Sequence, residues 1–177
     1  IYYGGAGTDT IDLSAITEAL EIRLGNAGTE RGSVTGASQS DVIWGFENAI
    51  GGAGDDKIVA SEAANVLDGG AGNDTFVFEP VTAANGTMIK GFAAGDKLCF
   101  SDIDADTSMD GHQDFTFKTP ASLAESGVGL QLGELTFSHG SEDGADVTTV
   151  MGMTNEGQFE VKLSGHLNLV EEENFIF

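Results

Sequence analysis

The sequence predicts an all-β protein in which a parallel β-coil continues into a β-rich cap. Three observations favour this fold class. A glycine- and aspartate-rich motif recurs every nine residues between positions 51 and 77, a short run with one large apolar residue follows each copy, and alternating apolar runs occupy the second half. A chain of 177 residues fits one domain, or one extended domain with a distinct cap.

The repeat is clearest in residues 51–59, GGAGDDKIV, and in residues 69–77, GGAGNDTFV. Residues 60–68 form a degenerate copy in the same frame, with Asn65 at the Asp position and Leu67 at the large apolar position. Glycine tolerates positive φ and close backbone approach, so each glycine-rich run can turn sharply with its carbonyl oxygens directed into a small space. One turn and one strand per nine residues give two strands per revolution, with Ile58, Leu67 and Phe76 stacking in the interior.

The Asp that closes each turn adds a hard anionic oxygen, and calcium takes about six to eight oxygen ligands. Asp56 and Asp74 close the two complete turns and, at eighteen residues apart, lie on the same side of the coil. Residues 4–12, with Gly5, Gly7 and Asp9, form a further copy that is out of phase with the other two. The glycine-aspartate turns are therefore candidate calcium sites, and an insert separates the first copy from the rest.

The insert, residues 13–50, contains the alternation Leu20-Glu21-Ile22-Arg23-Leu24, which predicts a strand with its three aliphatic side chains inward. A short helix over residues 15–24 is the competing interpretation. Residues 41–44, DVIW, resemble the end of another repeat and add Asp41 to the candidate ligands.

Acidic residues outnumber basic ones by 29 to 7, which gives a formal net charge of −22. This balance excludes an electrostatic partnership with nucleic acid or anionic lipid, and divalent cations are the natural counter-charge. The 40% hydrophobic content, with 11 Phe, argues against intrinsic disorder. No apolar run approaches membrane-spanning length, so membrane insertion is not expected. Cys99 lies in an apolar run and is expected to be buried.

The order of motifs along residues 4–78 resembles the RTX calcium-binding region of bacterial proteins exported by type I secretion, such as serralysin-type proteases, mannuronan epimerases and large adhesins. Residues 46–52, FENAIGG, match a segment that often precedes the repeats in that family, and residues 88–100 resemble the segment that closes the roll. The resemblance implies a right-handed parallel β-roll over residues 1–92, with the insert at 13–50. It also implies a mainly antiparallel cap over residues 93–177.

The same resemblance implies a calcium ion between the turns at 51–56 and 69–74. Its expected ligands are the carbonyls of Gly52, Gly54, Gly69 and Ala71 and the carboxylates of Asp55 and Asp74. Asp56 is expected to serve an adjacent upstream site, and Gly5, Gly7 and Asp9 part of another. The turn with Asn65 departs from the pattern, and the turn at 69–74 has no evident downstream partner because residues 82–87 preserve neither the glycines nor the Asp.

The function implied by the resemblance is calcium-dependent folding and type I secretion, without catalysis, at the C-terminus of a larger bacterial exoprotein, either an RTX adhesin or a secreted enzyme. Its partners would be calcium and the ABC transporter complex of type I secretion, and its place the outside or surface of a Gram-negative bacterium. The start at Ile1 is interpreted as an excision from that larger protein. Residues 171–177, acidic and then hydrophobic, are similar to the secretion signal of type I substrates.

Two other functions are weaker interpretations. A polysaccharide-binding accessory domain, like the R-modules of epimerases, would need a basic or aromatic strip that is not evident. Catalysis is disfavoured because the three His lie far apart and neither H-E-x-x-H nor G-x-S-x-G occurs. Residues 102–106, DIDAD, begin like an EF-hand loop, but Thr107 and Gln113 replace the turn glycine and the bidentate Glu, so a solvated acidic loop is favoured over a weak metal site.

Overall fold

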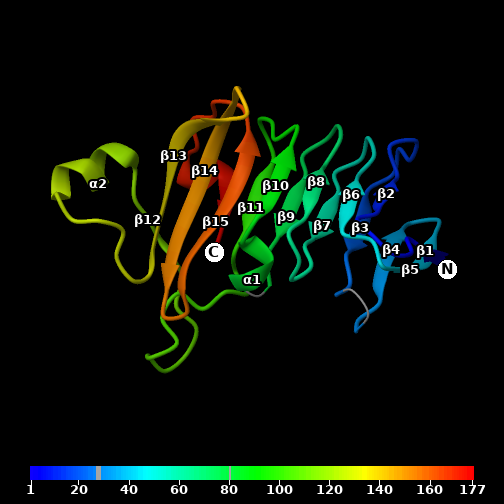
Figure 1. Ribbon diagram of the computed structural model, residues 1–177, viewed down its shortest axis with the longest axis horizontal. Helices are drawn as coiled ribbons and strands as arrows, with labels where there is room; N and C mark the ends of the chain where they lie inside the picture. Colours follow the sequence, from blue (N-terminus) through cyan, green and yellow to red (C-terminus); the bar gives the residue numbers. More distant parts are fainter. Residues whose placement is uncertain (27–28, 80) are drawn as a thin grey trace.

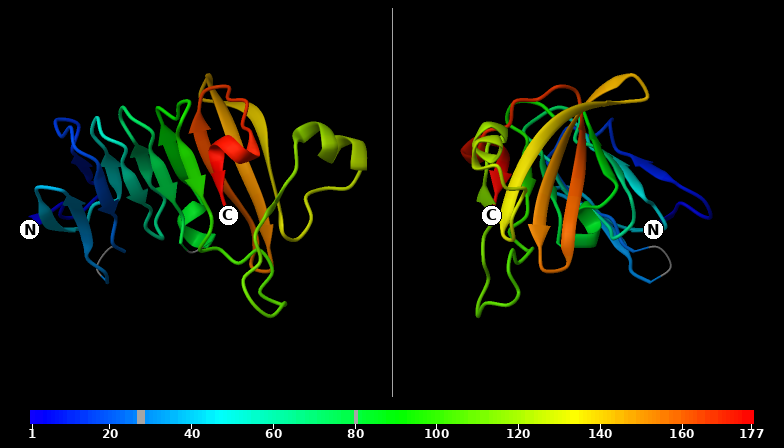
Figure 2. Two further views of the ribbon diagram at one scale, coloured as in Figure 1. Left: turned by 180° about the vertical axis from the view of Figure 1, so that it is seen from behind. Right: turned by 60° about the vertical axis from the view of Figure 1, so that its left-hand side comes forward.

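The computed structural model describes residues 1–26, 29–79 and 81–177, and short strands follow one another along its long axis (Figure 1). Within these residues the strands form two eight-stranded sheets, called sheet A and sheet B here. The N-terminal strands lie at one end and the cap at the other, and the other views agree (Figure 2). The predicted all-β class is confirmed.

The strand order in sheet A is β1 (Tyr2–Tyr3), β5 (Ser40–Trp44), β4 (Gly32–Gly36), β3 (Leu20–Arg23), β7 (Lys57–Val59), β9 (Thr75–Val77), β11 (Lys97–Cys99), β16 (Phe175–Ile176). The order in sheet B is β12 (Thr116–Phe117), β13 (Glu134–Glu142), β14 (Ala145–Thr154), β15 (Gly157–Ser164), β10 (Thr87–Lys90), β8 (Val66–Asp68), β6 (Asn48–Ile50), β2 (Thr10–Asp12). The helices are short: α1 (Val81–Ala84), α2 (Pro120–Ser126), α3 (Glu171–Asn174).

Consecutive strands from β6 to β11 alternate between the sheets, and we call this part, residues 48–99, the coil. Strands β6, β8 and β10 pair in parallel in sheet B, while β7, β9 and β11 pair in parallel in sheet A. Ile58 lies opposite Phe76 in sheet A, and Leu67 lies in sheet B. This pairing is what a nine-residue period with two strands per revolution predicts.

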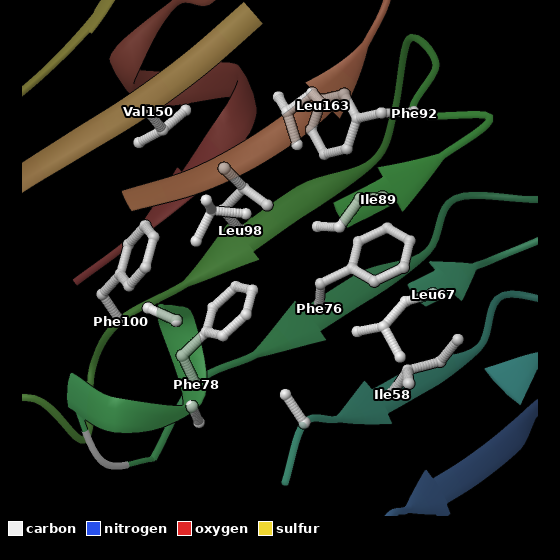
Figure 3. Packing of buried hydrophobic residues seen from close by; sticks show 14 of the residues in the cluster. Ile58, Leu67, Phe76, Phe78, Ile89, Phe92, Leu98, Phe100, Val150 and Leu163 are labelled. Atoms are coloured by element: carbon white, nitrogen blue, oxygen red, sulfur yellow. The ribbon is translucent and has the colours of Figure 1, made fainter. Parts of the chain in front are cut away.

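Each sheet contributes a continuous row of side chains to the interior, part of which is visible in Figure 3. The row of sheet A contains Ile22, Ile58, Phe76, Leu98 and Phe175. The row of sheet B contains Ile11, Ala49, Leu67, Ile89 and Leu163. All ten are buried, and burial of each large apolar side chain contributes about 1.5–3 kcal/mol to stability. Cys99 is also buried, in a separate small cluster with Val59 and Val77, as expected.

The insert forms strands that extend sheet A rather than a helix. Strand β3 pairs in parallel with β7 and antiparallel with β4, and β4 pairs antiparallel with β5. Leu20, Ile22 and Leu24 are buried, which confirms the strand interpretation of this segment. Asn48–Ile50, at the end of the insert, forms β6 and belongs to the coil.

The cap continues both sheets of the coil. Strands β13, β14 and β15 are antiparallel to one another, β15 is parallel to β10, and β16 is parallel to β11. Phenylalanine rings pack between the coil and the cap. The ring centroid of Phe100 lies 5.3 Å from that of Phe78 and 5.4 Å from that of Phe159. Among the described residues, no helix combines the length and apolarity that crossing a membrane requires.

Candidate metal centre

The turns between the sheets form two stacks at opposite edges of the molecule. The first stack contains the turns that lead from sheet B to sheet A, residues 13–19, 51–56, 69–74 and 91–96. The second stack contains the turns that lead from sheet A to sheet B, residues 4–9, 45–47, 60–65 and 81–86. The two complete glycine-aspartate repeats at 51 and 69 are therefore neighbours in the first stack.

These two turns are in direct backbone contact. The N–H of Ala71 donates to the carbonyl of Gly52 at 2.9 Å, and the N–H of Thr75 donates to that of Asp56 at 2.8 Å. A Cβ on Gly70 would collide with the Gly52 carbonyl, and Gly70 also has a φ of 95°. Because only glycine combines this φ with this approach, the motif brings the carbonyls of one turn against the next.

Buried aspartates connect successive turns of the first stack. Asp56, Asp74 and Asp96 are at most 3% exposed. Asp96 Oδ1 accepts a hydrogen bond from the N–H of Asp74 at 2.9 Å, and Asp74 Oδ1 accepts one from the N–H of Asp56 at 2.8 Å. Asp56 Oδ1 accepts one from the N–H of Leu20 at 2.8 Å. Each carboxylate thus fixes the backbone of the turn that precedes it in the stack.

Asp74 differs from the other two in its second carboxylate oxygen. Asp56 Oδ2 accepts from the N–H of Gly52 at 2.6 Å and Asp96 Oδ2 from that of Ala93 at 2.8 Å. Within the described residues, Asp74 Oδ2 is buried and has no hydrogen-bond partner. The pKa of Asp74 is raised to about 6. Burial is the main cause, the nearby carboxylates contribute, and the hydrogen bond from the Asp56 N–H acts in the opposite direction. An unpartnered buried oxygen of this kind costs about 1–3 kcal/mol, so a proton or a cation is favoured here.

The groups around Asp74 Oδ2 fit calcium. A Cβ on Gly69 would collide with this oxygen, and one on Gly51 would collide with the Gly69 carbonyl, so glycine backbone encloses the carboxylate. Carboxylate and carbonyl oxygens are the ligands that calcium prefers. Asp55, at the surface, has its Oδ1 bonded to the N–H of Asn73 at 2.8 Å. In residues 1–26, 29–79 and 81–177, no group of three or more His, Cys, Asp or Glu is arranged to hold a metal.

The structure brings together the predicted ligands of the turns at 51–56 and 69–74, which are Gly52, Gly54, Asp55, Asp56, Gly69, Ala71 and Asp74. Ala71 and Gly54 lie at the contact between these turns. The N–H of Ala71 donates to the carbonyl of Gly52, and a Cβ on Gly72 would collide with the carbonyl of Gly54. Asp56 faces the insert, since the N–H of Ala53 in its turn also donates to the carbonyl of Ile16 at 2.9 Å.

The other predicted ligands lie elsewhere. Gly5, Gly7 and Asp9 belong to the second stack, where the N–H of Asp9 donates to Glu47 Oε2 at 2.9 Å and Asp9 Oδ2 is buried without a partner among the described residues. Asp41 lies in β5, opposite Val34, and lines a cavity of about 360 Å³ near the N-terminal end. Neither group joins the oxygens around Asp74.

The degenerate turn of the second stack is closed by neutral groups. Asn65 is buried, its Oδ1 accepts from the N–H of Ser61 at 2.9 Å, and its Nδ2 donates to the carbonyl of Glu47 at 2.7 Å. The next position in this stack is Thr87, whose hydroxyl donates to the carbonyl of Ala83 at 2.9 Å. These turns thus hold their neighbours without a buried carboxylate.

The nine-residue frame did not identify Asp96 as the downstream neighbour of Asp74. Asp56 and Asp74 are separated by 18 residues but Asp74 and Asp96 by 22, and the four additional residues match the length of α1, Val81–Ala84. The expectation that the turn at 69–74 has no downstream partner is wrong, because residues 91–96 supply that turn. The N–H of Lys97 donates to the carbonyl of Asp74 at 2.8 Å. The Gly95-Asp96 pair was the available signal, in the segment similar to the one that closes the roll.

Comparison with known proteins gives two similarities. The family described as "Peptidase M10 serralysin C terminal" matches residues 1–168. "Metallopeptidase AprA" of Pseudomonas marginalis is 38% identical over 66 residues, which are 37% of this chain and 14% of that protein. The chain therefore aligns with a small part of this relative's length.

Proposed function

We propose that this chain, which belongs to the family of serralysin C-terminal domains, folds when it binds calcium and thereby serves export by type I secretion. The family is the non-catalytic C-terminal part of secreted serralysin-type proteases. The calcium dependence and the mode of export are our inferences for this chain. The parent protein would be a secreted enzyme or an adhesin.

The observation that carries the proposal is the unpartnered Asp74 Oδ2 between two glycine turns. Without metal, the folded state must bury this oxygen beside Asp96, Asp56 and Asp55, whose charges disfavour its ionisation. A calcium ion would be held by Asp74 with the carbonyls of Gly52, Gly54, Gly69 and Ala71 and the carboxylate of Asp55. When bound, it supplies the positive charge that the interior of the turn lacks.

Calcium would act as a folding switch because it binds the ordered turns and not the unfolded chain. A site held at about ten times its dissociation constant adds roughly 1.4 kcal/mol, and at about a hundred times roughly 2.7 kcal/mol. Extracellular calcium modules have dissociation constants of about 10⁻⁴ to 10⁻³ M, so cytosolic calcium would leave these sites empty. The glycine-rich turns would then retain their conformational entropy, and the chain would stay unfolded until it reached the outside.

The C-terminal segment is consistent with export before folding. Phe175 is buried, and β16 pairs with β11 at the end of sheet A. Glu171–Asn174, of which the first three residues are acidic, form α3 directly before this strand. A transporter that reads this acidic-hydrophobic segment in extended form would have to meet it before β16 joins the sheet.

The test is the circular dichroism and thermal melting of the chain with calcium and with EDTA, for the wild type, D74N and D110N. We expect calcium to raise the melting temperature of the wild type and of D110N, in which an exposed Asp of the 102–114 loop is changed. D74N should lose most of this response, because an amide binds calcium more weakly than a carboxylate. Equal β signal and equal melting of the wild type in calcium and EDTA would reject the proposal.

A further inference from the structure

The two sheets end differently on the N-terminal side of the molecule. Strand β2 is the last strand of sheet B there, whereas sheet A continues past β3 with β4, β5 and β1 (Figure 1). Beyond β2 and β3, which pair with the first coil strands β6 and β7, sheet A therefore has three further strands and sheet B has none among the described residues. The outer edge of β2 is consequently unpaired.

The backbone groups of β2 alternate between its paired side and its unpaired side. The carbonyl of Asp9 accepts from the N–H of Asn48 at 3.0 Å, and the N–H of Leu13 donates to β6 at 2.9 Å. Since the hydrogen-bonding residues of a strand in a parallel ladder alternate between its two sides, Thr10 and Asp12 direct their N–H and carbonyl groups away from β6. Unpaired strand groups of this kind are a template for another extended chain.

The cavity of about 360 Å³ near the N-terminal end adjoins this edge. All of β2 lines it, together with apolar side chains that include Tyr2 of β1, Val34 of β4 and Phe46. Ile11, at the N-terminal end of the interior row of sheet B, is one of the lining residues. Because side chains at one level of neighbouring strands share a face, a strand added to β2 would direct the residue opposite Ile11 into this cavity.

The polar groups of the cavity favour a peptide with a positive charge. Gln39 Nε2 is buried and has no hydrogen-bond partner among the described residues, so it can donate to a carbonyl of a bound chain. Asp12 and Asp41 add two carboxylates, and the lining residues include no Lys or Arg in the part of the chain that the structure describes. Asp12 is exposed at the edge itself, where it can meet a basic side chain.

We propose that the unpaired edge of β2 binds an extended peptide segment of another protein, with a large apolar residue in the cavity followed by a Lys or Arg. Strands β6, β8 and β10 pair in parallel, and an added strand in the same register would have its outward residues opposite Thr10 and Asp12. The basic residue is expected opposite Asp12, because opposite charges across a sheet are stabilising and like charges destabilising.

Charge also distinguishes this occupant from a second copy of the chain. The formal net charge of −22 opposes association of two copies and attracts a basic peptide. The site involves an edge and a cavity beside β2, and not the buried aspartates of the first stack. The proposal therefore does not depend on the proposed calcium function, although the measurements are made in calcium.

The experiment is a fluorescence-anisotropy titration of a labelled, blocked peptide, Gly-Ser-Thr-Leu-Lys-Ser-Gly, with the full chain. We expect saturable binding that weakens at least about tenfold when Ser replaces the Leu, because the apolar burial is lost. Methylation of the Leu nitrogen should weaken it similarly, because that nitrogen could no longer donate to the Thr10 carbonyl although all side chains remain. Replacing the Lys by Glu should also weaken binding.

A matched pair of variants locates the charged contact. In D12N the preference for the Lys peptide over the Glu peptide should fall to near one, whereas D110N, which removes the same charge from an exposed loop position, should keep it. D12N is expected to stay folded, since Asp12 Oδ1 accepts from the N–H of Ser14 at 3.0 Å and an amide oxygen can accept the same bond. Circular dichroism checks the fold of both variants.

Four results would overturn the proposal. These are no binding of the Leu-Lys peptide, equal affinity for the N-methylated peptide, and equal loss of the Lys preference in D12N and D110N, which would assign the preference to net charge. The fourth is a dimer in sedimentation that the peptide dissociates, because a second copy would then be the occupant of the edge.

Discussion

The two turn stacks close the same coil with different chemistry. Within residues 48–99, the buried side chains between turns are the carboxylates of Asp56, Asp74 and Asp96 in the first stack and the neutral Asn65 and Thr87 in the second. Nearer the N-terminus the second stack also contains Asp9, whose Oδ2 is buried without a partner among the described residues. An amide or a hydroxyl carries both donor and acceptor, but a carboxylate only accepts. Asn65 therefore satisfies its neighbours by itself, while Asp74 keeps an oxygen without a partner.

The difference shows that a nine-residue coil does not in itself require a cation. A counter-charge is favoured where the interior carboxylate has no N–H for its second oxygen, as at Asp74, whereas both oxygens of Asp56 and of Asp96 accept N–H groups. A continuous apolar row runs through each of the two sheets, so apolar packing is present beside both stacks. Within residues 48–99, one edge of the coil therefore buries an oxygen without a partner, at Asp74, and the other is closed by the hydrogen bonds of Asn65 and Thr87.

The largest expected effect comes from removing the close approach of turns in the first stack. Gly70 and Gly5 occupy the same position of the motif and have similar φ angles, 95° and 111°. Their surroundings differ. A Cβ on Gly70 would collide with the Gly52 carbonyl, whereas a Cβ on Gly5 would meet nothing within 4 Å. We expect G5A to lose about 1–2 kcal/mol from its backbone conformation alone. G70A should lose more than about 3 kcal/mol, because the Gly52 turn must also move.

Urea unfolding of both variants in calcium measures this difference. Similar losses in G5A and G70A would mean that positive φ is the whole reason for the glycines. The stacking of turns 51–56 and 69–74 would then not restrict the sequence, and the contrast between the stacks would lose its structural basis.

The coil and the close contact of its turns could be predicted from the sequence because both follow from local rules. Glycines at fixed offsets dictate the turns, and one apolar residue per repeat dictates the interior, as the pairing of Ile58 with Phe76 confirms. The nine-residue period did not predict the position of Asp96, because α1 interrupts the period before it. The position of Asp96 depends on α1, which lengthens one revolution by the four residues Val81–Ala84 and carries no glycine signal.

The cap shows a second limit of sequence reasoning. The rings of His139 and His166 are hydrogen-bonded although 27 residues separate them, and what brings them together is the antiparallel register of three strands and the two hydrogen bonds of the Thr148 hydroxyl to the segment after β15. Alternation predicts that such strands exist but not which residues pair. Likewise, the partner-free state of Asp74 Oδ2 depends on where every nearby N–H is directed, which no motif specifies.

An intermediate effect is expected from placing an acid in the second stack. Asn65 Nδ2 donates to the Glu47 carbonyl at 2.7 Å and to the Ser61 hydroxyl at 2.9 Å, and a carboxylate cannot donate either bond. We expect N65D to lose about 2 kcal/mol in EDTA, since a buried acceptor would face another acceptor. Calcium should not restore this loss, because the turn at 60–65 lacks the glycines of the motif.

The control for N65D is N155D, an exposed residue that accepts a hydrogen bond from the N–H of Thr107 at 2.8 Å, which Asp can also accept. Urea unfolding with and without calcium compares the two. If calcium fully restored the stability of N65D, the turn at 60–65 could bind calcium once it carried an Asp. The two stacks would then differ only in this side chain and not in the structure of their turns.

The smallest expected effect is the pH dependence that Asp74 gives to the first stack. The pKa of Asp74 is about 6 in the folded protein against 3.8 for an ordinary Asp, and burial is the main cause. Between these values the folded, metal-free chain binds a proton that the unfolded chain releases, so its free energy of unfolding should fall as pH rises. We expect a decrease on the order of 1–2 kcal/mol from Asp74 between about pH 4 and pH 7.

Calcium should reverse this dependence, because binding to Asp74 requires the ionised carboxylate and competes with the proton below about pH 6. The stabilisation by calcium should therefore be larger near pH 7 than near pH 4.5. Urea unfolding of the wild type and D74N at both pH values isolates Asp74, because only the wild type should show the falling component in EDTA. If D74N showed the same pH profile as the wild type, Asp74 Oδ2 would not set the charge state of the first stack. The difference between the two stacks would then come from packing alone.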